Sequence, residues 1–342
     1  MKSCFVKTIV LLAILFFTGA CIVQKRVSEL CAKAESDKKK YSSFRPGELW
    51  YDTDGNVINA HGDGLLFRNN TYYWYGEVRG ATASQGVNVY SSKDLYDWRF
   101  EALALAQEKD TASDIRLGCV MERPKVIYNE KTKKYVVWFH LELKGKGYSA
   151  ARAGVAMSDR PTGPFMFVKS FRPNDNMSRD MTLFVDYDGS AYQVYSSREN
   201  YDLRLAKLSD DYLSATVNGS LLFSKHREAP ALFRYRDNYF LITSGCTGWA
   251  PNRANLHEAK SLFGPWEFVG DPMTGPGAEL TFGGQLTYVL PVLGKKDALP
   301  FMADRWNPKK LKDSRYRWLP VQFKEGMPFI GWTEEWHGHS FR

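Results

Sequence analysis

Short apolar stretches separated by turn residues recur five times along the chain, in the same order each time. Each copy starts with a polar residue and a short apolar strand, passes through a turn rich in Asn, Asp, Gly or Lys, and enters a second strand with an aromatic residue at its centre. The aromatic positions, 62, 57, 47 and 62 residues apart, are Tyr73, Tyr135, Tyr192, Tyr239 and Phe301. A repeat of this length indicates one supersecondary unit per copy.

A second pair of strands follows these hairpins. Apolar runs such as residues 87–90 and 154–157 end in turns that contain Ser and Asp. Each unit therefore holds about four short strands, and no long helical periodicity follows the N-terminal segment. Repeated four-stranded units predict an all-β fold, a five-bladed β-propeller with an axial pocket. A β-sandwich is the alternative, but it does not explain the fixed order of motifs in every unit.

The N-terminal residues depart from this pattern. An apolar run at residues 9–17 is flanked by Lys2 and Lys7, ends in small residues before Cys21, and is too short to span a bilayer. Small residues before a cysteine are typical of a bacterial lipobox, which would leave Cys21 as a lipid-carrying N-terminus. An ordinary secretory signal cleaved near Ala20 is the alternative. The chain thus divides into a lipoprotein signal peptide (1–20), a polar, charge-dense tether (21–45) and the propeller domain (46–342).

Charge and cysteine content narrow the choice of partners and cofactors. The chain has 46 Lys and Arg against 38 Asp and Glu, a net charge of +8, and two of these lysines leave with the signal peptide. Nucleic-acid binding is therefore not predicted, and the basic run at 309–317 is interpreted as a solvated loop. Cys31, Cys119 and Cys246 show no C-x-x-C spacing, so neither a disulfide framework nor a metal site is predicted.

Polar residues stand where the propeller brings chain segments together. The first strand of each blade lines the axis, so the residues that open these strands point into one cavity. By alignment on the aromatic positions, they are Gly62 with Asp63, Glu122, Asp180, Glu228 and Gln285. Carboxylates that converge on one pocket raise the pKa of at least one of them. This arrangement favours a functional site over a structural core.

Seven motifs carry a family resemblance. They are WYDTDG at 50–55, INAHG at 58–62, YWYGE at 73–77, ERPK at 122–125, SRDMT at 178–182, REAPA at 227–231 and SGCTGW at 244–249. In this order they resemble glycoside hydrolase family 43, and more closely its exo-β-1,3-galactanase (galactan 1,3-β-galactosidase) branch. The resemblance covers nearly all of the chain after the tether, and it implies hydrolysis of glycosidic bonds with inversion.

The resemblance also implies roles for the axial carboxylates. Inversion requires a general acid at the leaving oxygen and a base that activates water on the opposite face of the sugar. By motif, Glu228 is the acid, and Asp180 holds it in place and raises its pKa. The alternative for Asp180 is a turn residue that pairs with Arg179.

The base is where the sequence departs from the wider family. Most members place an Asp at the position that reads Gly62 here. Asp63 lies one residue further, where strand alternation reverses the side chain, and is one candidate base. Gln285 matches a glutamine that is thought to position the water in the galactanase branch, in its imidic acid form. Its other interpretation is a hydrogen-bonding group for the substrate.

Further residues are implied to bind the terminal sugar. They are Glu122 and Glu77 for its hydroxyls, Asn200 and Thr247 as additional contacts, Trp249 as a stacking platform and His61 near the axis. The alternatives are an ion pair of Glu122 with Arg123 or Lys125, a surface carboxylate for Glu77, and a buried structural histidine for His61. Some family members hold a central calcium, but nothing in this sequence specifies one, so no cofactor is expected.

The expected function is exo-acting release of galactose from β-1,3-galactan, the backbone of arabinogalactan, by a protein anchored in the bacterial cell envelope through lipid on Cys21. Two alternatives stay open at this point. One is a β-xylosidase or α-L-arabinofuranosidase with the same machinery. The other is a lipoprotein that binds glycan without cleaving it.

Overall fold

The computed structural model describes residues 41–338, except 81–84, 291–298 and 314. The predicted signal peptide (1–20) and most of the predicted tether (21–45) lie outside the described residues. Within the described part of the chain, no helix has the length and apolar character needed to cross a membrane.

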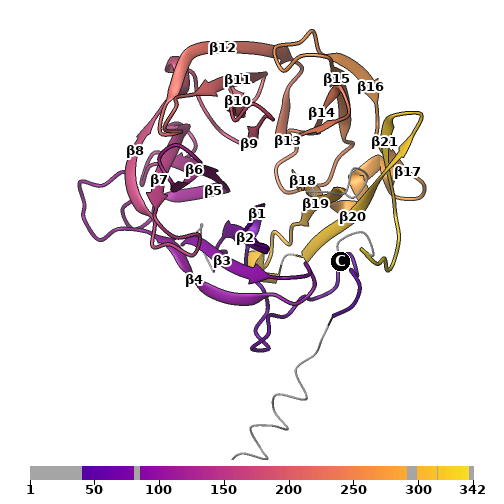
Figure 1. The fold of residues 1–342 in the computed structure, drawn as a ribbon, viewed down its shortest axis with the longest axis horizontal. Helices are drawn as coiled ribbons and strands as arrows, with labels where there is room; N and C mark the ends of the chain where they lie inside the picture. The colour runs from indigo at the N-terminus through magenta and orange to yellow at the C-terminus, as the bar shows by residue number, and fades with distance from the viewer. Residues whose placement is uncertain (1–40, 81–84, 291–298, 314, 339–342) are drawn as a thin grey trace, which may run out of the picture.

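Five sheets, antiparallel apart from one short edge strand, surround a central axis (Figure 1). The predicted five-bladed propeller is confirmed, and a sandwich of two sheets is excluded. The first three blades are β1 (His61–Arg68), β2 (Thr71–Glu77), β3 (Gly86–Ser92) and β4 (Arg99–Ala106); β5 (Val120–Asn129), β6 (Lys134–Glu142), β7 (Arg152–Ser158) and β8 (Met166–Phe171); and β9 (Met181–Val185), β10 (Ala191–Ser197), β11 (Asp202–Leu208) and β12 (Ala215–Ser224). The last two are β13 (Arg227–Tyr235), β14 (Asn238–Gly245), β15 (Asn255–Ala259) and β16 (Glu267–Gly270); and β18 (Gln285–Val289), β19 (Leu299–Arg305), β20 (Arg315–Lys324) and β21 (Met327–Gly331), with β17 (Met273–Thr274) parallel to β21. The connections contain the short 3₁₀ segments η1 (Pro173–Asp175), η2 (Ala278–Gly283) and η3 (Leu311–Asp313).

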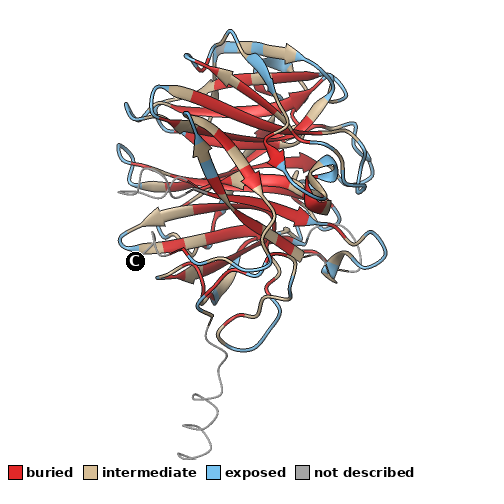
Figure 2. Ribbon diagram, turned by 90° about the vertical axis from the view of Figure 1, so that its right-hand side faces the viewer, coloured by how far each residue is buried: buried red, intermediate tan, exposed pale blue. Residues whose placement is uncertain are grey.

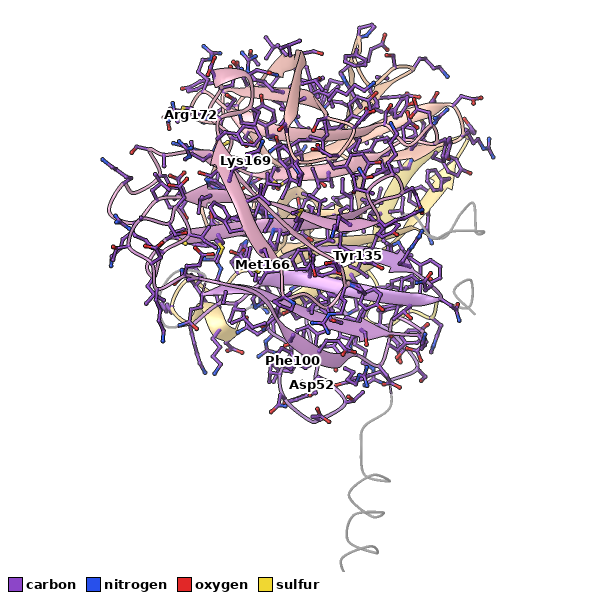
Figure 3. The ribbon with its side chains drawn as sticks, turned by 60° about the vertical axis from the view of Figure 1, so that its left-hand side comes forward. Asp52, Phe100, Tyr135, Met166, Lys169 and Arg172 are labelled. Carbon is purple, nitrogen blue, oxygen red and sulfur yellow. The ribbon has the colours of Figure 1, made fainter. Side chains whose placement is uncertain are left out.

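Burial falls from the axis outward, as Figure 2 shows. The first strands of the blades contact one another around the axis, and large side chains such as Trp138 and Phe240 are fully buried. On the second blade, the inner-hairpin residue Tyr135 is buried, whereas Met166 of the outermost strand β8 is 67% exposed (both labelled in Figure 3). Most aromatic residues therefore form the scaffold between blades.

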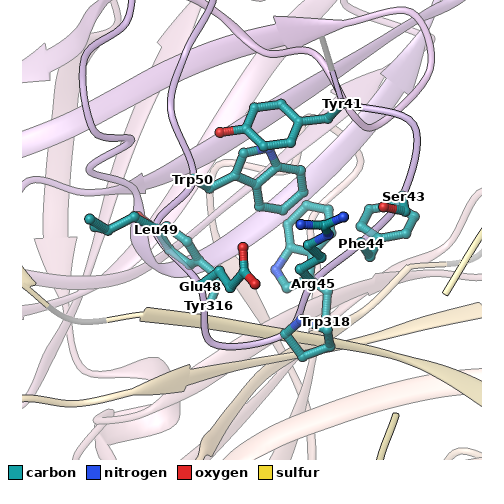
Figure 4. A pocket seen from close by; sticks show the side chains of 10 residues that line it. Tyr41, Ser43, Phe44, Arg45, Glu48, Leu49, Trp50, Tyr316 and Trp318 are labelled. Carbon is teal, nitrogen blue, oxygen red and sulfur yellow. The ribbon is translucent and has the colours of Figure 1, made fainter. Parts of the chain in front are cut away.

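Aromatic side chains close the ring between the fifth blade and the first. Phe44 and Trp336 are joined by backbone hydrogen bonds of 2.8 and 3.0 Å, and their rings stack at 4.2 Å. Trp74 of β2 contacts Trp318 of β20 at 4.7 Å. A small hollow beside this cluster is lined by Trp50, Trp318 and neighbouring residues (Figure 4). The two ends of the described chain thus hold the ring closed by apolar packing.

A shared bulge sets the inner hairpins in register. His61, Glu122 and Glu228 each pair with the second strand, and the next matched pair lies three residues along the first strand but only two along the second. In the fifth blade, which starts with Gln285, the irregularity falls one pair later, between Leu286 and Tyr288. The residue after His61, Glu122 and Glu228 has a positive φ, 57° at Gly62, 56° at Arg123 and 50° at Ala229. Such an extra residue bends a strand and redirects its side chains.

This register corrects the alignment of the first blade. In the first blade, the residue that matches Tyr135 and Tyr239 is the buried Tyr72, not Tyr73. Tyr72 pairs with Phe67, which lies as far along its strand from His61 as Arg234, the partner of Tyr239, lies from Glu228. The position equivalent to Glu228 is therefore His61 rather than Gly62. The prediction failed because adjacent tyrosines cannot be told apart by spacing alone.

Truncation of Phe44 tests the ring closure. Phe44 is 2% exposed, so we expect Phe44→Ala to lower the free energy of unfolding by about 3–5 kcal/mol, measured by urea denaturation. Phe268→Ala, at a site 62% exposed on the outer strand β16, is the matched control and should cost less than about 1 kcal/mol. Equal losses in the two variants would show that the N-terminal segment does not hold the ring.

Candidate active site

A pocket of about 220 Å³ opens at the axis and receives side chains from all five blades. It is lined by Glu77, Arg79, Glu122, Arg123, His140, Tyr148, Arg179, Asp180, Asn200, Glu228, Gly248, Trp249, Gln285 and Trp306. Seven of the ten site residues expected from the sequence are in this set, namely Glu228, Asp180, Gln285, Glu122, Glu77, Asn200 and Trp249. The other three, Thr247, His61 and Asp63, do not line the pocket.

Glu228 lies at the start of β13, just before the bulge, and is 9% exposed. Its carboxyl accepts hydrogen bonds of 3.0 Å from Asn200 Nδ2 and from Gln285 Nε2. Burial, and then the charge of Asp180, raise its pKa to about 8. Glu228 is therefore protonated at neutral pH, as a general acid must be.

Arg123 connects three blades at the base of the pocket. Its guanidinium lies 2.9 Å from Asp180 Oδ2, donates to Gln285 Oε1 at 2.7 Å and donates to the carbonyl of Leu286 at 2.6 Å. Asp180 thus pairs with Arg123, while Arg179 pairs with Glu199. The interpretation of Asp180 as a turn residue paired with Arg179 is wrong.

The amide of Gln285 is held in one orientation. Its Oε1 accepts from Arg123 and, at 2.7 Å, from the indole Nε1 of Trp306. Neither group can accept a hydrogen bond, so the amide oxygen must face them and Nε2 must face Glu228. The 3.0 Å contact between Gln285 Nε2 and Glu228 Oε1 is far shorter than the roughly 6.5–9.5 Å between acid and base in inverting glycosidases. The two side chains must separate before a sugar and a water fit between them.

A second cluster of charges lies across the pocket around Arg79. Arg79 Nη2 is 2.9 Å from Glu77 Oε2 and 3.0 Å from Glu122 Oε1, which also accepts from the hydroxyl of Tyr148 at 2.9 Å. Burial opposes the charge of Glu122, but His140, Arg79 and Tyr148 together lower its pKa. Burial raises the pKa of Glu77 to about 8, against the effect of Arg79. The alternative interpretation of Glu122, an ion pair with Arg123 or Lys125, is wrong, because Glu122 pairs with Arg79 and His140.

His140 supports Glu122 from the neighbouring strand β6. Its Nδ1 lies 3.3 Å from Glu122 Oε2, and its Nε2 lies 2.8 Å from Glu142 Oε1. Burial would lower the pKa of this imidazole, but the two carboxylates raise it to about 9. His140 is therefore a cation at neutral pH and holds Glu122 as an anion.

Gly62, where the sequence resemblance would place an aspartate, lies against the Glu77 carboxylate. Its φ is 57°, and a Cβ there would lie 2.6 Å from Glu77 Oε1, so a side chain would collide with that carboxylate. Asp63 follows in β1 and is 1% exposed, close to the charges of Asp304 and Lys125. Burial raises the pKa of Asp63 to about 8. As Asp63 does not line the pocket, it has no direct access to a water there.

The other two expected contacts lie beside the pocket. His61 is fully buried, with Nδ1 3.1 Å from Asp304 Oδ1 and its ring stacked on Tyr316 at 5.0 Å, which matches the structural interpretation. Thr247 lies in the loop that carries Trp249, and its hydroxyl donates to the carbonyl of Ala250 at 2.6 Å. Trp249 itself is 39% exposed and contacts Trp306 at 5.0 Å.

The axial groups do not suit the central calcium known in some propellers of the resembled family. The described residues contain no group of three or more His, Cys, Asp or Glu side chains arranged to hold a metal ion. The ammonium of Lys125 already donates to the carbonyl of Gly62 at 2.9 Å, beside Asp63. The nitrogen of Lys125 thus already occupies one of the oxygen donors that a calcium ion would need.

Seven lining residues were not anticipated as site residues, namely Arg79, Arg123, His140, Tyr148, Arg179, Gly248 and Trp306. His140 carried a signal, because it pairs directly with Glu122 across the inner hairpin. Arg79 and Trp306 follow just after the ends of β2 and β19, where the strand pattern has stopped. Tyr148 comes from the loop between β6 and β7, and no sequence period places it near the axis.

A propeller with a buried, protonatable glutamic acid in a sugar-sized polar pocket has the architecture of a glycoside hydrolase. The sequence profile of glycosyl hydrolases family 43 matches residues 57–279. The chain belongs to this family.

Solved structures extend the comparison. The chain is 48% identical to a family 43 β-1,3-galactosidase determined with galactodeoxynojirimycin, over 86% of this chain and 100% of that chain, with a TM-score of 0.84. It is 35% identical to the exo-β-1,3-galactanase of Phanerochaete chrysosporium determined with β-1,3-galactotriose (86% and 68% covered, TM-score 0.79). It is 36% identical to the exo-β-1,3-galactanase of Clostridium thermocellum (86% and 66% covered, TM-score 0.79). No curated protein matches the chain significantly.

Replacement of Asp180 tests the electrostatic origin of the raised pKa. Asp180→Asn removes a negative charge beside Glu228 and leaves the Arg123 cation, so we expect the pKa of Glu228 to fall from about 8. A ¹³C NMR titration of the Glu228 carboxyl measures it. Asp188→Asn, in the exposed turn at the other end of the β9–β10 hairpin, is the control and should leave the pKa unchanged. An unchanged or higher pKa in Asp180→Asn would contradict this assignment.

Proposed function

We propose that the protein is an exo-acting glycoside hydrolase that releases galactose from β-1,3-galactan, the backbone of arabinogalactan, with inversion. The observation that carries this proposal is the protonated Glu228 in a pocket formed by all five blades. The resemblance to a β-1,3-galactosidase along that chain's full length supports galactan as the substrate.

In the proposed reaction Glu228 gives its proton to the oxygen of the scissile bond. Asp180 keeps the pKa of Glu228 high before this step, because a second anion nearby disfavours ionisation. Glu122, held as an anion, and Glu77 accept hydrogen bonds from hydroxyls of the terminal galactose. The half-exposed ring of Trp249 offers an apolar face for stacking on the sugar.

We assign the positioning of the attacking water to Gln285, because Asp63 does not reach the pocket. When the sugar enters, it breaks the contact between Gln285 and Glu228. Each of these two side chains then faces one side of the sugar ring. Arg123 and Trp306 keep the oxygen of Gln285 occupied, so its Nε2 faces the space where the water sits. As an amide, Nε2 positions this water but does not remove its proton, so the proton released on attack passes to solvent, from which Glu228 then regains its own.

We also propose that lipid on Cys21 anchors the enzyme in the bacterial cell envelope, with residues 21–45 as the tether. The small residues before Cys21 and the charge-dense stretch after it support this proposal. Full-length protein is then expected in the membrane fraction, and Cys21→Ala in the soluble one. Recovery of the native protein in the soluble fraction would contradict the anchor.

Removal of the acid tests the proposed function. Glu228→Gln keeps the shape but cannot donate the proton, so we expect galactose release from β-1,3-galactan to fall about 10²- to 10⁴-fold. Glu267→Gln, on the exposed strand β16, is the control and should keep full activity. ¹H NMR of the first product should show α-galactose, because inversion converts the β-linkage. Galactan binding without galactose release, or faster cleavage of xylan or arabinan oligosaccharides, would contradict the proposal.

The role of Gln285 predicts the effect of Trp306→Phe. This change keeps the ring beside Arg79 and Trp249 but removes one donor to Gln285 Oε1. We expect kcat to fall about 3- to 10-fold with little change in KM, since a typical hydrogen bond contributes about 0.5–1.5 kcal/mol. Trp266→Phe, which removes an indole donor to Leu262 on the fourth blade, should leave kcat unchanged. A loss confined to KM would mean that Trp306 binds substrate only.

A further inference from the structure

An arginine cluster, Arg305, Arg315 and Arg317, stands on one face of the fifth blade. Arg305 of β19 lies directly opposite Arg315 of β20, and Arg317 lies two residues further along the same strand. Residues directly opposite on antiparallel strands place their Cβ atoms about 4.5–5.5 Å apart, and like charges in that arrangement are destabilising. The strand pairing therefore places two arginines next to each other on one face of the sheet.

The protein itself offers little negative charge to this cluster. Arg315 pairs with Asp313 at 2.9 Å, but Arg305 is exposed and forms no ion pair with any residue that the structure describes. Arg317 packs over the ring of Trp332 at 4.7 Å, and burial together with the charge of Arg305 lowers its pKa to about 10. The repulsion between these side chains is thus only partly offset.

The segment that contains the cluster also carries much of the net positive charge of the chain. Residues 305–317 hold six Lys and Arg against one Asp, while the whole chain has a net charge of +8. Lys309, Lys310 and Lys312 of this stretch are exposed. Release of a neutral sugar uses none of these cations, so the proposed reaction leaves the stretch without a role.

The cluster adjoins the catalytic pocket. Arg305 and Arg315 line a hollow of about 340 Å³ with Asn307, Pro308 and Asp313, and Trp306 lines both this hollow and the catalytic pocket. The same tryptophan donates to Gln285. A galactan chain whose terminal residue occupies the pocket therefore has room for a substituent beside Trp306.

We propose that Arg305 and Arg315 form a subsite for an oxyanion on the galactan, either the carboxylate of a uronic acid branch or a sulfate ester. Planar guanidinium groups bind such oxyanions through paired hydrogen bonds. A bound oxyanion would offset the repulsion between the two arginines. This inference rests on the proposed function, because it places the anionic group on a substrate of the same pocket.

The test compares three galactan oligosaccharides with one backbone: unsubstituted, carrying a glucuronic acid branch, and carrying a sulfate. For each, kcat/KM is measured with the native enzyme, Arg305→Gln, and Arg236→Gln as the control. Arg236 is an exposed arginine in the β13–β14 turn, at the other end of that hairpin from Glu228. Thermal melting confirms that each variant is folded.

The native enzyme should prefer at least one anionic substrate over the unsubstituted one. We expect Arg305→Gln to lower that preference about tenfold, and Arg236→Gln to leave it unchanged. About 0.5 M NaCl should also weaken the preference, because salt screens an exposed site. The arm that shows the preference identifies carboxylate or sulfate as the ligand.

Two failures can be told apart. If the unsubstituted oligosaccharide yields galactose but neither anionic substrate is preferred, or Arg305→Gln keeps the preference, the basic stretch is a solvated loop and only the subsite is wrong. If no substrate yields galactose, the proposed function itself is wrong.

Discussion

The bulge at the start of the inner strands decides where the functional groups of this propeller stand. It turns the backbone just after His61, Glu122 and Glu228, and two of these three side chains enter the pocket. The left-handed residue that follows is a glycine in the first blade, where a side chain would meet the Glu77 carboxylate. In the second blade the same position is Arg123, whose guanidinium reaches the third and fifth blades. The same backbone irregularity thus places a glycine against the Glu77 carboxylate in one blade and an arginine that connects three blades in another.

The charges of the pocket are arranged so that neighbouring glutamates have opposite protonation states. Glu122 faces Arg79, the Tyr148 hydroxyl and a cationic His140, and it stays ionised although it is buried. Glu228 faces Asp180 and two amide groups, so burial prevails and it keeps its proton. Environment, rather than residue type, assigns the roles. In the proposed reaction the acid must hold a proton and the group that binds the sugar must accept a hydrogen bond, and a glutamate side chain can do either.

The sequence was sufficient to predict the features that repeat from blade to blade. It was insufficient to predict the features that depend on the register between strands. Five aromatic-centred hairpins predicted the propeller, and polar residues at the strand starts predicted Glu228, Glu122 and Gln285 as neighbours. Choosing Tyr73 in place of Tyr72 moved the first blade by one residue, since adjacent tyrosines cannot be told apart by spacing alone. The only partner that the sequence suggested for Arg123 was its neighbour Glu122, as an alternative, because proximity along the chain is visible in a sequence, whereas contact across an axis is not.

A neutral amide at position 285 fits the electrostatics of this pocket better than a carboxylate would. Glu228 Oε1 lies 3.0 Å from Gln285 Nε2, and a carboxylate at that distance would add a second anion beside an acid that already faces Asp180. It would also compete for Arg123, which forms an ion pair with Asp180 and with no other carboxylate among the described residues. Two anions beside Glu228 would raise its pKa further, until its proton became too weakly acidic to transfer. An amide makes the hydrogen bond without the charge, so Arg123 remains paired with Asp180 and the acid keeps a pKa from which it can donate.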